Sequence, residues 1–197
     1  MASMQYPLEF TFKFWSLSPK IIVTDAQGQV VLFVKQKLFR LKEVINICAD
    51  VEQKQLLYQI KADRIIDFSA RYNFIDPSGR TIGAVKRRGL KSFWHAHYDI
   101  LNGDTPAFTI QEENPWVKVV DSLLSQIPLV GMFSGYFFNP VYVVSRVSGG
   151  VVMRLEKRPS FLSRVFIVKQ VDRLNSTEET EALLSLLMML LLERNRG

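Results

Sequence analysis

The sequence predicts a mainly β domain, a closed antiparallel barrel of about twelve strands around a buried hydrophobic C-terminal helix, with one short peripheral helix. Three observations favour this fold class. Short β-branched and aromatic runs separated by turn residues fill residues 10–169, and a hairpin motif recurs among them. Residues 175–197 have the composition of a helix that is apolar on all sides. We expect residues 1–197 to form a single domain.

The hairpin motif occurs twice in register. Asp25-Ala26-Gln27-Gly28 lies between two apolar runs, and Asp76-Pro77-Ser78-Gly79 repeats it 51 residues later. Aspartate starts such a turn and glycine takes its positive-φ position. A weaker third copy has its turn at Val147–Gly150. Repeated hairpins predict a meandering sheet long enough to close. Further strands are expected at residues 44–49, 56–61, 65–71, 93–101, 107–111 and 164–171.

One segment interrupts the β pattern. Asn114-Pro115 is a helix start, and apolar residues at helical spacing then predict a short amphipathic helix over residues 115–126. The connection over residues 128–140 is rich in glycine and aromatic residues. If it is exposed, it predicts a membrane or partner contact, and if it folds onto the barrel it is core. The contact residues would be Met132, Phe133, Tyr136 and Phe137.

The C-terminal segment predicts the barrel's central helix. Ala182–Leu192 contains one polar residue, Ser185, and is too short for the roughly 20 apolar residues of a bilayer span. Ser176 and Glu179 have the spacing of a capping box, which begins a helix in water. A twelve-stranded barrel is too wide for its own side chains to fill, so it needs such a helix inside. A membrane anchor is the alternative.

Charge is unevenly distributed along the chain. The net charge is +6, and residues 35–91 carry thirteen lysines and arginines against six acids, whereas the rest is close to neutral. This excess would favour an anionic partner, although a solvated barrel exterior explains it too. Cys48 is the only cysteine, which is typical of a reducing, intracellular setting. The N-terminus lacks a basic region followed by a long apolar run, so we expect no signal peptide.

Several stretches carry a family resemblance. They are the D-x-x-G hairpins, the run from Val34 to Leu41 (VKQKLFRL), the run from Ile82 to Gly89 (IGAVKRRG) and the leucine-rich terminus. With them the chain resembles the LURP-one-related proteins of the tubby C-terminal-like superfamily, which also includes the phospholipid scramblases. The resemblance implies a twelve-stranded barrel around a hydrophobic C-terminal helix. Tubby domains bind phosphoinositides and scramblases move lipids, but no phosphoinositide-binding motif or calcium loop of these families matches positions in this sequence.

The sequence gives no positive support for catalysis. His95, His97 and Asp99 share one face of a predicted strand, but neighbouring ligands about 7 Å apart are too spread for one small ion, so no metal is expected. Cys48 lies in an apolar run and is expected to be a core residue. The chain has no G-x-S-x-G, P-loop or dinucleotide-binding motif, and we expect no cofactor and no enzyme activity.

The predicted anion-binding residues occupy equivalent positions in two repeats. In strands, Lys35 and Lys37, and likewise Lys86 and Arg88, would point the same way and form two parallel cationic rows that can hold phosphates or anionic headgroups. The competing interpretation is that these lysines keep the strands soluble and block edge pairing. The full predicted set is Lys35, Lys37, Arg40, Lys42, Lys86, Arg87, Arg88 and Lys91.

These features together predict a non-enzymatic binding or scaffold module. Its expected partners are anionic phospholipid headgroups, a membrane surface or another protein, reached through the basic face. Charge alone would also suit nucleic acid, but no recognised nucleic-acid-binding fold accompanies it, so we do not expect that partner. The alternative is a scramblase-like lipid-handling protein that contacts the bilayer through residues 128–140. In either case we expect a cytoplasmic protein that can lie peripherally at the membrane.

Overall fold

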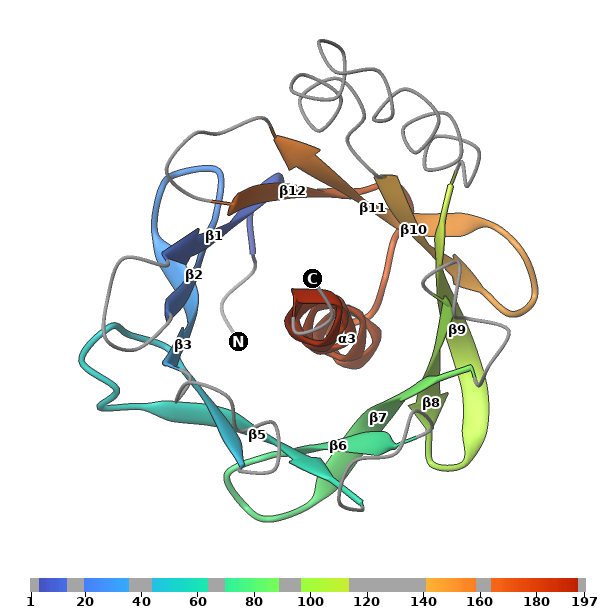
Figure 1. Ribbon diagram of the computed structural model, residues 1–197, viewed down its shortest axis with the longest axis horizontal. Helices are drawn as coiled ribbons and strands as arrows, with labels where there is room; N and C mark the ends of the chain where they lie inside the picture. The colour runs from blue at the N-terminus through green and yellow to red at the C-terminus, as the bar shows by residue number, and fades with distance from the viewer. Residues whose placement is uncertain are drawn as a thin grey trace, which may run out of the picture.

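The computed structural model describes residues 4–13, 20–35, 44–63, 70–88, 97–113, 141–158 and 164–194. These residues form a closed antiparallel barrel with one helix along its axis (Figure 1). The predicted fold class is therefore confirmed. The strands are β1 (Leu8–Lys13), β2 (Lys20–Thr24), β3 (Val30–Lys35), β4 (Ile45–Cys48), β5 (Leu56–Ala62), β6 (Arg71–Ile75), β7 (Thr81–Arg87), β8 (His97–Asn102), β9 (Thr105–Glu112), β10 (Val141–Arg146), β11 (Val151–Arg158) and β12 (Arg164–Gln170), and the helix is α3 (Ser176–Arg194).

The strand order is a simple meander. Each strand pairs with its neighbours in sequence, and β1 closes the barrel by pairing with β12. This closing pair joins Phe10 to Phe166, residues that no local sequence pattern connects. Closure leaves the barrel without a free edge strand, so every described strand forms ladders on both sides.

The repeated turns have the same geometry. In each, the aspartate backbone N–H and C=O close the turn, with Gly28 N–H to Asp25 O and Gly79 N–H to Asp76 O both at 2.9 Å. Gly28 and Gly79 have φ of 78° and 85°, the left-handed region that favours glycine. Each aspartate carboxylate also accepts backbone N–H groups two and four residues on. The sequence repeat is therefore a structural repeat.

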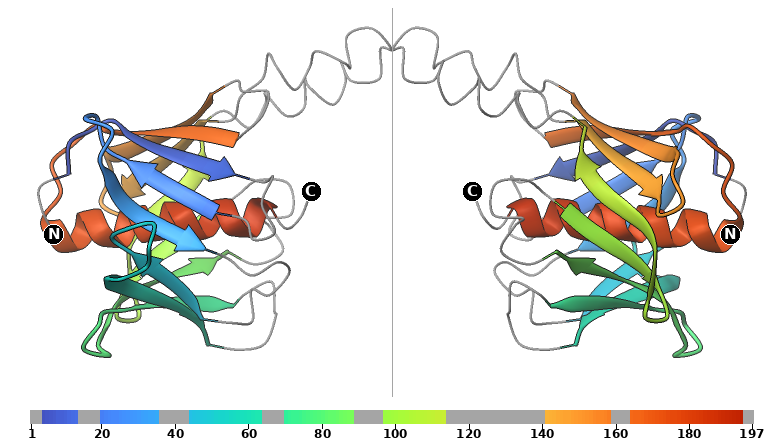
Figure 2. Two further views of the ribbon diagram at one scale, coloured as in Figure 1. Left: turned by 90° about the vertical axis from the view of Figure 1, so that its left-hand side faces the viewer. Right: turned by 90° about the vertical axis from the view of Figure 1, so that its right-hand side faces the viewer.

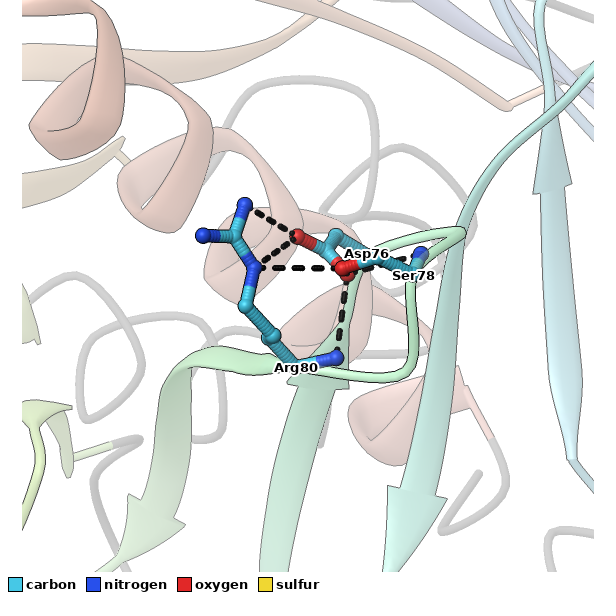
Figure 3. A network of polar contacts seen from close by, with 3 residues as sticks. All are labelled: Asp76, Ser78 and Arg80. Carbon is cyan, nitrogen blue, oxygen red and sulfur yellow. Dashed lines mark hydrogen bonds and ion pairs between the residues drawn. The ribbon is translucent and has the colours of Figure 1, made fainter.

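Asp76 makes the denser of the two turns (Figure 3). Its Oδ1 accepts the Ser78 hydroxyl at 2.6 Å, and its Oδ2 accepts Arg80 Nη2 at 2.9 Å. The Ser78 hydroxyl and the Arg80 N–H groups hold the pKa of Asp76 down, at about 2. The third repeat keeps the backbone pattern with Arg146 in place of aspartate, since Gly149 N–H donates to Arg146 O at 2.9 Å.

Helix α3 runs along the barrel axis (Figure 2) and is buried on every side. Residues Ala182–Leu191 are each at most 5% exposed. Ten successive residues cover the full circumference of a helix with 3.6 residues per turn, so the barrel wall surrounds it. Within the described ranges, no helix has the length and apolar character needed to cross a bilayer.

The helix begins one residue earlier than the capping-box prediction. Asn175, not Ser176, is the N-cap, because its Oδ1 accepts the N–H groups of Thr177 (3.0 Å) and Glu178 (2.9 Å). Glu178 Oε2 in turn accepts the Asn175 N–H at 2.9 Å. Asn175 and Ser176 each stand three residues before a glutamate, so either could start a capping box. Glu179 lies near Tyr6 instead: burial, and then the charge of Glu179, raises the pKa of Tyr6. The expected Ser176–Glu179 box is therefore wrong.

Glu181 and Ser185 are polar side chains of α3 in the barrel interior. Glu181 is 1% exposed and Ser185 0% exposed, and within the described residues neither Glu181 Oε1 nor Ser185 Oγ has a hydrogen-bond partner. Burial, and then the charge of Glu178, raises the pKa of Glu181 to about 7. Gly83 on β7 makes room for it, because a Cβ there would lie 2.9 Å from both Glu181 Cγ and Oε1.

Some expected elements fall outside the described residues. The peripheral helix over residues 115–126 and the apolar segment 128–140 are among them. The strand expected at 65–71 falls mostly there too, and the first strand of the second hairpin begins at Arg71.

Candidate functional site

The two ends of the barrel differ in their chain connections and in the charged side chains that lie there. At one end, here called the turn end, the D-x-x-G turns lie beside the start of α3. At the other, here called the mouth, odd-numbered strands end, even-numbered strands begin and α3 ends, as Figure 2 shows for the helix. Charged side chains gather on both surfaces of the wall at the mouth.

Three lysines form a row on the outer surface of the mouth. Lys13 lies directly opposite Lys20, and Lys20 directly opposite Lys35, on the adjacent strands β1, β2 and β3. Their neighbours Phe12 and Ile21 point into the core, so the lysines point outward. Opposite residues in a ladder have Cβ atoms about 5 Å apart. We call Lys13, Lys20 and Lys35 the lysine ladder; within the described chain, none of the three forms an ion pair.

The two predicted cationic rows do not lie side by side. Lys35 is on β3 and Lys86 on β7, four strands away in the barrel order. At about 4.8 Å per strand this separates them by about 19 Å along the wall. The reason is the repeat itself, which has a period of four strands and therefore puts equivalent residues a third of the way around the barrel. Lys35 instead joins Lys13 and Lys20.

Acidic side chains offset the positive charge of the second predicted row, Lys86 and Arg88. Arg88 Nε donates to both oxygens of Asp99, at 2.8 and 2.9 Å. Next to it, Arg71 Nη2 donates to Gly103 O at 2.7 Å, and Arg71 pairs with Asp104. A depression of about 400 Å³ on this wall has three acids and two bases in its lining, the polar members being Asp63, Arg71, Lys86, Asp99 and Asp104.

Arg87 differs from the rest of the predicted set, because it points into the barrel and is 8% exposed. Its guanidinium lies 5.7 Å from the centre of the Tyr98 ring and 3.6 Å from a carboxylate oxygen of Glu193 near the end of α3. The Tyr98 hydroxyl donates to Glu193 Oε1 at 2.6 Å. This cluster joins β7 and β8 to the helix, so Arg87 contributes to the inside of the mouth and not to an outer cationic row.

A cavity of about 160 Å³ opens beside this cluster, on the inner side of β1, β10, β11 and β12; we call it the mouth cavity. Phe12, Phe166 and Leu190 form its apolar side. Lys157 lies opposite Phe166 in the β11–β12 ladder, and Arg164 lies opposite Phe12 in the β1–β12 ladder, so both cations are at inward-facing positions. Tyr142, Lys157, Arg164 and Glu193 form the polar side.

The residues considered for metal binding or catalysis have other surroundings. Asp99 is engaged by Arg88, and the described residues contain no group of three or more metal-binding side chains. Burial, and then the positive charge of Arg88, lowers the pKa of His97. Cys48 is 4% exposed, as expected for a core residue, and burial raises the pKa of its thiol. His95 lies outside the described ranges.

Most of the predicted contact residues also lie outside those ranges. They are Lys37, Arg40, Lys42, Lys91, Met132, Phe133, Tyr136 and Phe137.

Two properties of the sequence conceal the charged residues at the mouth. Charge counting over residues 1–34 gave a neutral total, because Lys13 and Lys20 at the mouth were cancelled by Glu9 and Asp25 nearer the turn end. The inward position of Lys157 could have been predicted from the sequence. Lys157 continues the alternation of Met153 and Leu155, which are buried.

Comparison with known proteins places this fold in a family. The sequence profile described as LURP-one-related matches residues 30–190. The chain belongs to the LURP-one-related family. No curated protein matches it. Among solved structures it is similar to the crystal structure of a protein from Arabidopsis thaliana, with 16% identity and a TM-score of 0.50 over 98% of this chain and 93% of that one. At that identity the likeness supports the barrel fold alone.

Proposed function

We propose that the protein is a non-enzymatic binding module whose lysine ladder recognises anionic lipid headgroups at a membrane surface. The barrel fold and membership of the LURP-one-related family are consistent with a binding module. The observation that carries the proposal is the ladder: Lys13, Lys20 and Lys35 lie directly opposite one another on adjacent strands.

This arrangement is unfavourable without an anion. Like charges directly opposite each other in a ladder destabilise a sheet, by roughly 0.2–1 kcal/mol per pair. The edge-blocking explanation for the lysines does not apply, because the closed barrel leaves no edge at β1, β2 or β3. A phosphate between the ammonium groups would convert this repulsion into attraction. Three lysines near an anionic surface contribute about 3 kcal/mol, or roughly 100-fold in affinity.

The test is flotation with phosphatidylcholine vesicles that contain or lack phosphatidylserine or a phosphatidylinositol phosphate. Three proteins are compared: the wild type, the triple variant Lys13→Gln/Lys20→Gln/Lys35→Gln, and the control Lys54→Gln/Lys61→Gln/Lys169→Gln. The control removes the same charge from lysines on different parts of the barrel. We expect binding only to anionic vesicles, weakened by salt, and reduced about 100-fold in the ladder variant alone.

Other results would contradict the proposal. Equal losses of vesicle binding in the two triple variants would mean that binding depends on the net charge of the protein and not on the lysine ladder. Absence of vesicle binding would favour a protein partner. Salt-resistant binding that is lost in Phe133→Ser/Phe137→Ser would favour insertion of residues 128–140, the scramblase-like alternative, which stays a prediction.

A further inference from the structure

The mouth cavity has the size and lining of a small-ligand site. Its volume of about 160 Å³ is close to that of engineered protein cavities that hold a benzene molecule. Phe12 and Phe166 meet edge to face at its apolar side, with ring centroids 5.6 Å apart and planes at 71°. Leu190 of α3 completes that side and is 5% exposed. The cavity as a whole therefore has room for about six carbon atoms.

The polar side of the cavity has more positive than negative groups. Lys157 and Arg164 line it from adjacent strands, and Lys157 has no ion-pair partner within the described chain. Among the described lining residues Glu193 is the one acid, and its Oε1 is already engaged by the Tyr98 hydroxyl and by Arg87. A cationic ligand would therefore find no uncompensated carboxylate in this lining.

Tyr142 adds a hydrogen-bond donor. Burial, and then the charges of Glu112 and Glu193, raises the pKa of its phenol, so the hydroxyl keeps its proton at neutral pH. An ammonium, a guanidinium and a phenol O–H line one space, so hydrogen-bond donors outnumber carboxylates among the described lining residues. A carboxylate, which accepts only, fits such a set.

We propose that the mouth cavity binds a medium-chain alkyl carboxylate. The carboxylate lies against Lys157 and Arg164, and the alkyl chain lies between Phe12, Phe166 and Leu190. The proposal is independent of the lysine ladder, which is on the outer surface of the wall, whereas these residues are on the inner surface. Chain length is its sharpest consequence. Each methylene buried should strengthen binding about fourfold until roughly six carbons fill the cavity, after which the gain should stop.

The test is isothermal titration calorimetry of the full-length protein with butyrate, hexanoate and octanoate, each below its micelle-forming concentration. Hexylamine and hexanol are the matched ligands with the opposite charge and with none. We expect saturable binding of hexanoate, weaker binding of butyrate, octanoate similar to hexanoate, and no comparable binding of the amine. Lys157→Met should reduce hexanoate affinity at least tenfold, whereas the control Lys61→Met, an exposed outward lysine on β5, should not.

A second variant keeps the test independent of charge. Leu190→Phe fills part of the cavity with the larger side chain and should reduce hexanoate binding while the thermal unfolding transition stays cooperative. If this variant does not fold, Lys157→Met decides. Equal binding of hexanoate and hexylamine, equal effects of the two lysine variants, or no saturable binding at millimolar hexanoate would each overturn the proposal. Because no vesicle is present, failure here leaves the lysine ladder proposal unaffected, and the reverse also holds.

Discussion

The turn end and the mouth of this barrel satisfy their polar groups in different ways. At the turn end, Asp25 and Asp76 bond to groups within four residues of themselves, and Asn175 and Glu178 cap the helix across three. At the mouth, Tyr98 bonds to Glu193, 95 residues away. Such local bonds make the Asp25 and Asp76 turns and the helix cap properties of short sequence motifs. The mouth exists only once strands and helix have assembled, and this is where candidate binding groups collect.

The helix that joins the two ends should be the most sensitive part of the molecule. Leu187 is 0% exposed in the middle of α3. Leu187→Asp would bury a charge and leave a void, at a cost above about 4 kcal/mol, and should unfold the whole barrel. Circular dichroism and gel filtration would detect the loss. Thr177→Asp, an exposed change on the first turn, is the control. A folded, soluble Leu187→Asp protein would refute the central role of the helix.

Glu181 is the exception at the turn end, because its Oε1 has no hydrogen-bond partner among the described residues. Its pKa is about 7 in the folded protein against an ordinary 4.5, so the folded state keeps its proton to higher pH than the unfolded state does. The free energy of unfolding should therefore fall as pH rises from about 4.5 to 7, by up to about 3 kcal/mol. Urea unfolding at pH 5 and pH 8 would measure this.

Glu181→Gln should remove most of that pH dependence, because the amide does not titrate. Glu52→Gln, at an exposed acid of the β4–β5 turn, should leave it unchanged. An identical pH slope in the wild type and Glu181→Gln would show that other groups cause it.

At the mouth, Tyr98→Phe should remove a buried hydrogen bond to a carboxylate. We expect a loss of about 1.5–3 kcal/mol in the free energy of unfolding, since such bonds are stronger than neutral ones. A double-mutant cycle with Glu193→Gln isolates the pair. Coupling near zero would mean that the Tyr98–Glu193 hydrogen bond does not hold the helix end at the mouth.

The smallest effect is expected from Asp76→Ala at the turn end. The carboxylate bonds only to its own turn, so its loss should lower the melting temperature slightly and leave the mouth residues in place. Because these bonds depress the pKa of Asp76 to about 2, the stabilisation should be present at neutral pH and disappear as pH falls toward 2. Thermal melts at pH 7 and pH 2.5 would compare the variant with wild type. A larger loss than that of Tyr98→Phe would reverse the contrast between the two ends.

Prediction from sequence succeeded where the signal is local. The Asp25 and Asp76 turns, the strands beside them and the apolar C-terminal helix follow from residues close together in the chain. The helix cap was misplaced by one residue, because Asn175 and Ser176 both precede a glutamate by three positions and only the surroundings of Glu179 distinguish the two.

The candidate sites depended on contacts between distant segments. The lysine ladder needs the register of β1, β2 and β3, and the mouth cavity needs the closing pair of β1 with β12. The sequence repeat predicts that Lys35 and Lys86 belong to two parallel cationic rows, and only the strand order shows that four strands separate these rows around the wall.

By itself, the sequence determined the class of the fold: its turn residues, its alternation and its wholly apolar helix are compatible with a filled barrel. Only the tertiary structure decided which charges meet. Side-chain alternation in a strand predicts whether a residue points into or out of the barrel. Which residue lies opposite it on the next strand depends on register and on barrel closure. Register places Lys13 and Lys20 in the lysine ladder and makes Arg87 an interior residue for that reason.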